Sequence, residues 1–170
     1  MMARSSSHRM LGGSTLVEVL VSVGVLAVAV PLVFGALAES GDSSLAARAE
    51  TRSAWITPVC MDEIRASREG RSRYFPATVA GQMFPPDGDV WALAFSADGE
   101  PVGKLSTAQY QQGLHELNRT AVRYIAIMKS VNVTAPTGTD PMLRVDISLE
   151  YPAARRATER RKLVFHTRMP

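Results

Sequence analysis

The sequence RMLGGSTLVEVLVSVGVLAVAVPLVFGALA, residues 9–38, is almost wholly apolar after Gly13, yet it carries one acid, Glu18. As a helix, residues 14–38 would span about 37 Å at a rise of 1.5 Å per residue, enough to cross a hydrocarbon core of roughly 30 Å. A carboxylate inside a segment of membrane length is costly and is by default a candidate for function. Glu18 is therefore the first candidate functional residue of the chain.

Membrane insertion of this segment is favoured despite Glu18. Its Leu, Val and Phe side chains together contribute roughly −4 to −8 kcal/mol on the insertion scale, whereas an acid at the helix centre costs about 3 kcal/mol. Arg4 and Arg9 precede the segment, and Glu39 is the first charge after it. The positive-inside rule then predicts a cytoplasmic N-terminus and a C-terminal domain on the far side of the membrane.

Two processing schemes fit these residues. The first is a secretory signal peptide released after Ala38, because Ala36-Leu37-Ala38 matches a small-x-small cleavage site. The length of the apolar run argues against this scheme, since a signal peptide uses about 7–15 apolar residues, and Glu18 interrupts the run. The second scheme is cleavage on the cytoplasmic side after Gly13, which leaves Ser14 as the first residue.

The residues around the second cleavage site closely resemble the N-terminal signature of type IV pilins and type II secretion pseudopilins. That signature is a short basic leader ending in Gly, followed by a hydrophobic helix with Glu at its fifth position. Gly13 matches the last leader residue, Thr15-Leu16 the second and third positions of the mature chain, and Glu18 the fifth. Ser14 departs from the commoner Phe at the first position. The likeness covers residues 9–35 and implies cleavage after Gly13 by a prepilin peptidase and N-methylation of Ser14.

The same resemblance implies that Glu18 acts in assembly. In that family the cleaved N-terminal amine and the fifth-position carboxylate of neighbouring subunits are thought to neutralise each other. A buried charge is tolerated when it is paired with an opposite one, and a terminal amine with a reference pKa of about 8 is mostly cationic at neutral pH. The implied partners are other pilin-like subunits, the prepilin peptidase and the inner-membrane assembly platform. The implied location is the inner (cytoplasmic) membrane, which the chain would cross once with its C-terminal domain in the periplasm.

The chain beyond the membrane segment is expected to form an α+β domain. Residues 39–68 continue the helix as an amphipathic spine, loosened at Gly41 and kinked or broken near Pro58. Residues 69–170 are expected to form a soluble domain in which four or five antiparallel strands pack on that helix. The apolar stripe of the spine consists of Leu45, Ala49, Ile56, Val59, Cys60 and Ile64. The expected strands are residues 90–97, 102–105, 121–134, 143–151 and 161–167, with a loop or short helix over residues 106–119.

The C-terminal end, a strand closing in Tyr151-Pro152, a basic turn and a strand closing in Thr167, resembles that of minor pseudopilins of the I/V type. It is also similar to the pilin-like proteins of planctomycete and verrucomicrobial gene cassettes. Residues 1–13 would then be the prepilin leader and residues 14–38 the assembly helix. Because the soluble domain is small and lacks disulfides, a minor pseudopilin is expected rather than a major fibre subunit.

The sequence contains no motif for a catalytic nucleophile, a phosphate loop or a metal-binding helix, so it predicts neither an enzyme nor a cofactor. The single cysteine, Cys60, excludes an internal disulfide and is expected to be a buried packing residue. The net charge of +3, from 19 Lys+Arg and 16 Asp+Glu, gives no reason to propose nucleic acid as a partner. Trp55 and Trp91 are both expected in the core.

Two clusters of charged residues each have both an ordinary structural interpretation and a functional one. The Asp-Gly turns contain four acids that could hold calcium, although turn chemistry alone explains an Asp-Gly pair. The basic turn near the C-terminus could face an acidic partner, a polymer or lipid head groups, but such a run is more often a solvated hairpin. The acids are Asp87, Asp89, Asp98 and Glu100, and the basic residues are Arg155, Arg156, Arg160, Arg161 and Lys162.

Overall fold

The structure is a computed structural model, and it describes residues 15–79, 82–86, 89–132 and 143–169. The chain divides into two compact units, Met1–Leu45 and Ala46–Pro170. Among the described residues, the first unit is helical after Thr15, and the second contains the rest of that helix and a β-sheet. The predicted cleavage site, Gly13 and Ser14, lies outside the described residues.

One helix, α1 (Leu16–Arg68), contributes to both units. It begins after Thr15, whose hydroxyl oxygen accepts a 3.3 Å hydrogen bond from the Glu18 N–H, the geometry of an N-cap. Of the two outcomes expected near Pro58, a kink or a break, the break does not occur, because the helix continues through this residue. Proline removes one helical hydrogen bond, but Ile56 and Cys60 on either side of Pro58 are buried in the core and hold the chain in place.

The end of α1 is set by a glycine. Gly70 has φ +68°, a left-handed conformation that favours glycine, and the Arg71 N–H bonds to the Ala66 carbonyl oxygen at 2.7 Å. Together they form the usual glycine C-cap of a helix. The helix therefore ends at Arg68, the last residue of the expected spine.

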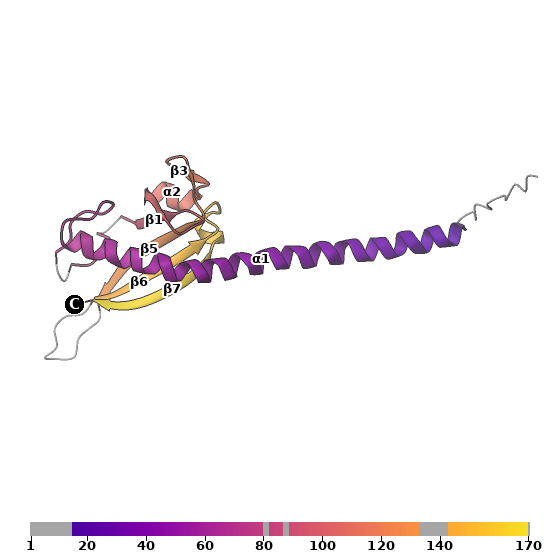
Figure 1. Ribbon diagram of the computed structural model, residues 1–170, viewed down its shortest axis with the longest axis horizontal. Helices are drawn as coiled ribbons and strands as arrows, with labels where there is room; N and C mark the ends of the chain where they lie inside the picture. Colours follow the sequence, from indigo (N-terminus) through magenta and orange to yellow (C-terminus); the bar gives the residue numbers. More distant parts are fainter. Residues whose placement is uncertain (1–14, 80–81, 87–88, 133–142, 170) are drawn as a thin grey trace, which may run out of the picture. The chain divides into compact units, whose positions relative to one another are not determined.

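The second unit is built on a five-stranded antiparallel sheet with strand order β2-β1-β5-β6-β7 (Figure 1). The strands are β1 (Trp91–Phe95), β2 (Pro101–Leu105), β5 (Tyr124–Asn132), β6 (Leu143–Tyr151) and β7 (Arg161–Met169). The predicted α+β fold, a long N-terminal helix packed against a small antiparallel sheet, is thus confirmed. β6 has the predicted bounds, whereas the other strands differ from their predicted ranges by one to three residues at one or both ends; the largest difference at a strand start is that β5 begins at Tyr124 and not at Ala121.

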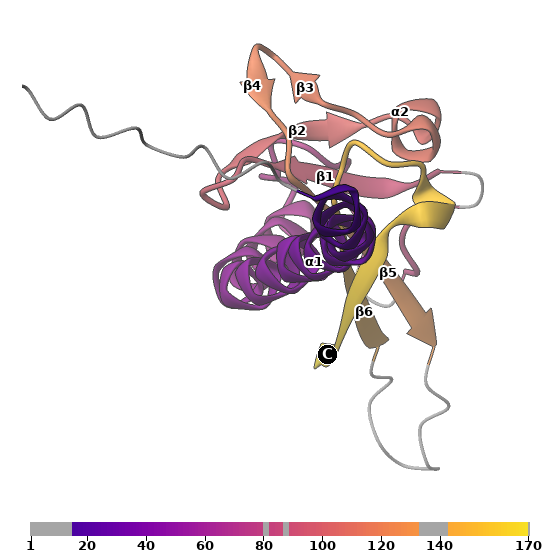
Figure 2. The ribbon, with the colours of Figure 1, turned by 90° about the vertical axis from the view of Figure 1, so that its right-hand side faces the viewer.

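The part of α1 from Ala46 onward packs on one face of this sheet (Figure 2). Trp91 lies at the centre of the core, fully buried and stacked between Phe75 (4.5 Å between ring centroids) and Phe84 (4.8 Å). The strands supply alternate residues to this face, as the period of two predicts. The buried residues of α1 are Ala49, Ser53, Ile56, Cys60, Ile64 and Ser67.

The opposite face of the sheet is partly covered by a short helix, α2 (Thr107–Gln112), and by a small hairpin of β3 (Glu116–Leu117) and β4 (Thr120–Ala121). These elements enclose a second apolar cluster around Ala92, Ala94, Leu105, Val122, Ile125 and Ala153. The short helix was among the predicted alternatives for residues 106–119, whereas the hairpin was not predicted. A 3₁₀ turn, η1 (Ala157–Glu159), precedes β7.

Candidate functional site

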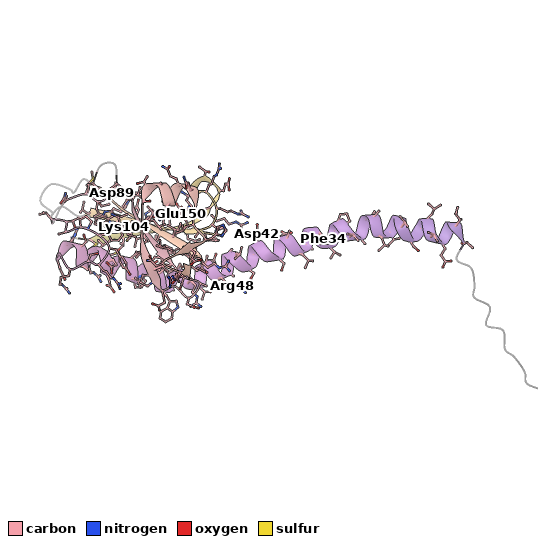
Figure 3. All side chains as sticks on the ribbon, turned by 90° about the horizontal axis from the view of Figure 1, so that it is seen from above. Phe34, Asp42, Arg48, Asp89, Lys104 and Glu150 are labelled. Carbon is pink, nitrogen blue, oxygen red and sulfur yellow. The ribbon has the colours of Figure 1, made fainter. Side chains whose placement is uncertain are left out.

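The first part of α1 exposes an almost continuous apolar surface. Figure 3 shows its side chains, among them Phe34, projecting around the helix. From Leu16 to Leu37 the helix is about 33 Å long at 1.5 Å per residue, close to the thickness of a hydrocarbon core. In the part of the chain that the structure describes, α1 is the one helix long and apolar enough to span a membrane, a test that a signal sequence also passes. It is therefore a candidate membrane span.

Glu18 lies in the first turn of this apolar helix. Its backbone N–H is bonded by the Thr15 hydroxyl, and its backbone carbonyl oxygen accepts a 2.8 Å hydrogen bond from the Ser22 hydroxyl. A carboxylate in the first turn also interacts favourably with the partial positive charge of the helix N-terminus. The sequence Thr15-x-x-Glu18 thus has a local role at the start of the helix, which the motif comparison alone had not indicated.

The basic turn near the C-terminus is not wholly solvated, which corrects the interpretation of Arg160. Its guanidinium is buried, with Nη1 3.2 Å from the Glu150 carboxylate and Nε donating to the Arg155 carbonyl oxygen at 2.8 Å. It also lies over the ring of Tyr110, 5.0 Å from the centroid, and bonds to the backbone carbonyl oxygen of that residue. Arg160 is therefore part of the domain's interior, whereas Arg155 and Arg156 are exposed.

Glu150 is the centre of this buried cluster. Besides Arg160, it accepts hydrogen bonds from Tyr110 Oη at 3.1 Å and from Lys162 Nζ at 2.8 Å. The hydrogen bond to Glu150 raises the pKa of Lys162, and burial is the main cause of the raised pKa of Tyr110. The cluster joins α2, β6 and β7, so its geometry supports a structural role.

A second charged cluster lies on β6 and β7, on the sheet face opposite α1. Arg144 holds the Asp146 carboxylate with two hydrogen bonds, from Nε (3.0 Å) and Nη2 (3.2 Å), and His166 Nδ1 lies 2.7 Å from the same carboxylate. Burial acts to raise the pKa of Asp146, but the hydrogen bonds from His166 and Arg144 outweigh it and lower that pKa. No sequence motif indicates this cluster, although the register of β6 and β7 accounts for it, since Asp146 faces His166.

Two acids of the Asp-Gly turns, Asp89 and Asp98, are in ion pairs. Asp98 accepts hydrogen bonds from Arg52 through both its carboxylate and its backbone carbonyl oxygen, and Asp89 pairs with Lys104 at 3.3 Å (Figure 3). Asp87 lies outside the described residues. Within the described ranges, no three His, Cys, Asp or Glu side chains form a group that could hold a metal ion.

Two of the remaining predictions have opposite outcomes. Cys60 is fully buried, as expected, and burial is the main cause that raises its pKa to about 12. Trp91 is also in the core, but Trp55 is not: 68% of its surface is exposed. Trp55 precedes Ile56 by one residue, which places it off the buried stripe of α1.

Comparison with known proteins gives no assignment: no family model, curated protein or solved structure matches this chain.

Proposed function

We propose that the chain is a pilin-like structural subunit, a minor pseudopilin of a type II secretion or type IV pilus-like filament. In this proposal a prepilin peptidase cleaves the chain after Gly13, and the product stays in the inner membrane until it is added to a filament. The partners are other pilin-like subunits and the inner-membrane assembly platform. The C-terminal domain lies in the periplasm.

The observation that carries the proposal is the composition of α1. One helix contains an exposed apolar segment of membrane length with an acid in its first turn, and it continues into a stripe that packs on the sheet of the second unit. An apolar surface of this extent is unfavourable in water, so it needs lipid or other apolar helices around it. A membrane before assembly and neighbouring subunits after assembly meet this need.

Glu18 acts in this proposal through its charge. When the first segment packs among other helices, the carboxylate leaves water, and its desolvation is offset only by an opposite charge at short distance. The amine of Ser14 in a neighbouring subunit supplies such a charge once the leader has been removed. The alternative role of Glu18, stabilisation of the helix start, is a property of the single chain.

The first experiment determines the N-terminus of the protein purified from native membranes, by intact mass and terminal sequencing. The proposal expects a start at Ser14, with or without a methyl group. A start at Glu39 would contradict it, because the segment that contains Glu18 would then be a signal peptide. The chain would instead be a secreted or periplasmic binding domain released after Ala38.

The second experiment separates the charge of Glu18 from its capping role. Glu18→Ala removes the carboxylate, whereas the matched control Thr15→Ala removes the N-cap hydroxyl and leaves the carboxylate in place. We expect both variants to be cleaved, Thr15→Ala to enter filaments and Glu18→Ala to remain in the membrane. Equal incorporation of the two variants would contradict an assembly role for the charge.

A further inference from the structure

Among the residues that the structure describes, strand β7 forms one edge of the sheet and pairs with β6 alone. An edge strand presents unpaired backbone N–H and C=O groups that can pair with another strand. In the described structure, no backbone hydrogen bond from β7 to a segment outside the sheet is found. β7 has nine residues and is one of the longest strands, so it offers a long pairing edge.

The register identifies which residues of β7 direct their backbone groups outward. The Ser130 N–H in β5 bonds to the Phe84 carbonyl oxygen at 2.7 Å, and not to Val145, its partner across the β5–β6 pair. Ser130–Val145 is therefore a non-hydrogen-bonded pair, and since the two kinds of pair alternate, Val145 directs its backbone groups to β7.

The same alternation then runs along β7. The partners of Val145, Ile147 and Leu149 are Thr167, Phe165 and Leu163, which use their backbone groups within the sheet. The residues between them have backbone groups that point away from the sheet. These outward-directed residues are Lys162, Val164, His166 and Arg168.

Charge along this edge has one sign. β7 contains Arg161, Lys162 and Arg168 together with His166, and it contains no acid. Lys162 and His166 are bonded to acids of β6, but Arg168 has no carboxylate partner among the described residues and stands opposite Arg144. Arg144 is already held by Asp146, so an acid supplied from outside would pair with Arg168.

The side chains along β7 also differ between the two faces of the sheet. Leu163 and Phe165 lie on the α1 side, where they pack against the core but remain partly exposed. Lys162, His166 and Arg168 lie on the other side. A strand added next to β7 would therefore place alternate residues beside a partly uncovered apolar row and beside a basic row.

We propose that the β7 edge binds an extended segment of a partner protein that pairs with β7 as an additional strand. The segment alternates acidic residues, which lie beside Lys162, His166 and Arg168, with apolar or β-branched residues, which extend the row of Leu163 and Phe165. Backbone hydrogen bonds provide affinity and the alternating side chains provide specificity. This surface belongs to the sheet domain and does not depend on the role proposed for Glu18.

A second copy of this chain is a poor occupant of the same edge. Pairing of β7 with another β7 supplies no acid to its arginines and lysine, because the strand contains no Asp or Glu. Charges on edge strands commonly prevent such pairing. The same charges attract a strand of opposite sign, which is why the partner is expected to be acidic and not a second β7.

The test uses the full chain in detergent micelles and fluorescent peptides as long as β7, nine residues. The first peptide alternates glutamate with valine and threonine, and the second replaces each glutamate with lysine. A third keeps the glutamates but carries N-methyl groups on the amides of one edge. Fluorescence anisotropy is expected to detect binding of the first peptide alone, with protection of the β7 amides from hydrogen exchange. Equal binding of the lysine or the N-methylated peptide would overturn the proposal, as would no binding of the glutamate peptide.

Two substitutions test the edge itself. Val164→Pro removes an outward N–H and no bond to β6, and Val164→Thr is its matched control. We expect Val164→Pro to weaken binding of the glutamate peptide by about tenfold or more and Val164→Thr to leave it unchanged. Arg168→Glu is expected to weaken that binding by about fivefold and to strengthen binding of the lysine peptide. Unchanged binding by Val164→Pro or Arg168→Glu would contradict the proposal, and circular dichroism would verify that each variant is folded.

Discussion

The Nη1 atom of Arg160 lies 3.2 Å from Oε2 of Glu150, and the two side chains are only 0% and 2% exposed. Each partner makes further hydrogen bonds, Arg160 to backbone carbonyl oxygens and Glu150 to Tyr110 and Lys162. A buried ion pair is tolerable when its remaining hydrogen-bonding groups are satisfied in this way. The pair links the last turn to β6 and α2, so a change in either partner affects the whole C-terminal part of the sheet.

Removal of one partner of this pair should be strongly destabilising. Arg160→Met leaves the Glu150 carboxylate without its buried counter-charge, with only the half-exposed Lys162 as a cationic partner, and we expect a loss of about 3 kcal/mol in the free energy of unfolding. The double variant Arg160→Met/Glu150→Met removes both charges and should recover most of this loss. Urea unfolding in detergent, followed by tryptophan fluorescence, measures both effects.

The matched control for this prediction is the exposed Arg156, which directly precedes η1. Arg156→Met should change the free energy of unfolding by no more than about 0.5 kcal/mol. If Arg160→Met were as mild as Arg156→Met, the interpretation of Arg160 as an interior residue would be wrong.

Asp146 should make a contribution to the free energy of unfolding that is lost at acid pH. Its pKa is lowered in the folded protein, because the hydrogen bonds from His166 and Arg144 outweigh the effect of burial. A lowered carboxyl pKa contributes stability that is present above the unfolded value of about 3.9 and is lost as the pH falls through the folded pKa. Asp146→Asn should therefore cost about 1 kcal/mol at pH 7, since both partners are partly exposed, and should cost little near pH 2.

Unfolding free energy measured against pH tests this assignment. The curve of the parent protein should fall more steeply below about pH 4 than the curve of Asp146→Asn. Asp62→Asn, at an exposed pair with Arg65, is the control and should leave the curve of the parent unchanged. Parallel curves for the parent and Asp146→Asn would show that the network adds no pH-dependent stability.

Cys60 should be nearly inert in the folded protein. Burial raises its pKa to about 12, and because the thiolate is the reactive form, the reactive fraction at pH 8 falls about a thousandfold relative to an ordinary thiol. Alkylation with iodoacetamide, followed by mass spectrometry, should be slow in the native protein and fast in urea. Rapid native alkylation would place Cys60 at the surface and contradict the packing of α1 on the sheet.

Much of the fold could be predicted because the controlling signals are local. The alternation of β6 and the helical spacing of Ala49, Ile56, Cys60 and Ile64 each determine which face is buried. The β3–β4 hairpin has no comparable signal: its strands have two residues each, and its turn uses positive φ at Asn118 (50°) and Arg119 (63°) instead of an Asn-Gly pair.

The charged clusters could not be predicted for a different reason. Whether Arg160 is buried depends on Tyr110, which lies 50 residues earlier in the chain and reaches the turn only after the sheet has formed. The Asp146 cluster likewise needs the register of β6 and β7, which sets Asp146 against His166. Charge content in a turn indicates solvation on average, and contacts distant in sequence decide the individual residue.

The two tryptophans should report on different environments. Trp91 is fully buried between Phe75 and Phe84, whereas Trp55 is 68% exposed on α1. Trp55→Phe should therefore leave a blue-shifted emission that iodide quenches weakly, and Trp91→Phe should leave a red-shifted emission that iodide quenches strongly. The stability effects should also differ: Trp91→Ala empties the centre of the core and should cost about 3–5 kcal/mol, whereas Trp55→Ala should cost less than about 1 kcal/mol. Strong protection of Trp55 from iodide in the isolated protein would contradict its exposure, because the side chain would then be covered in solution.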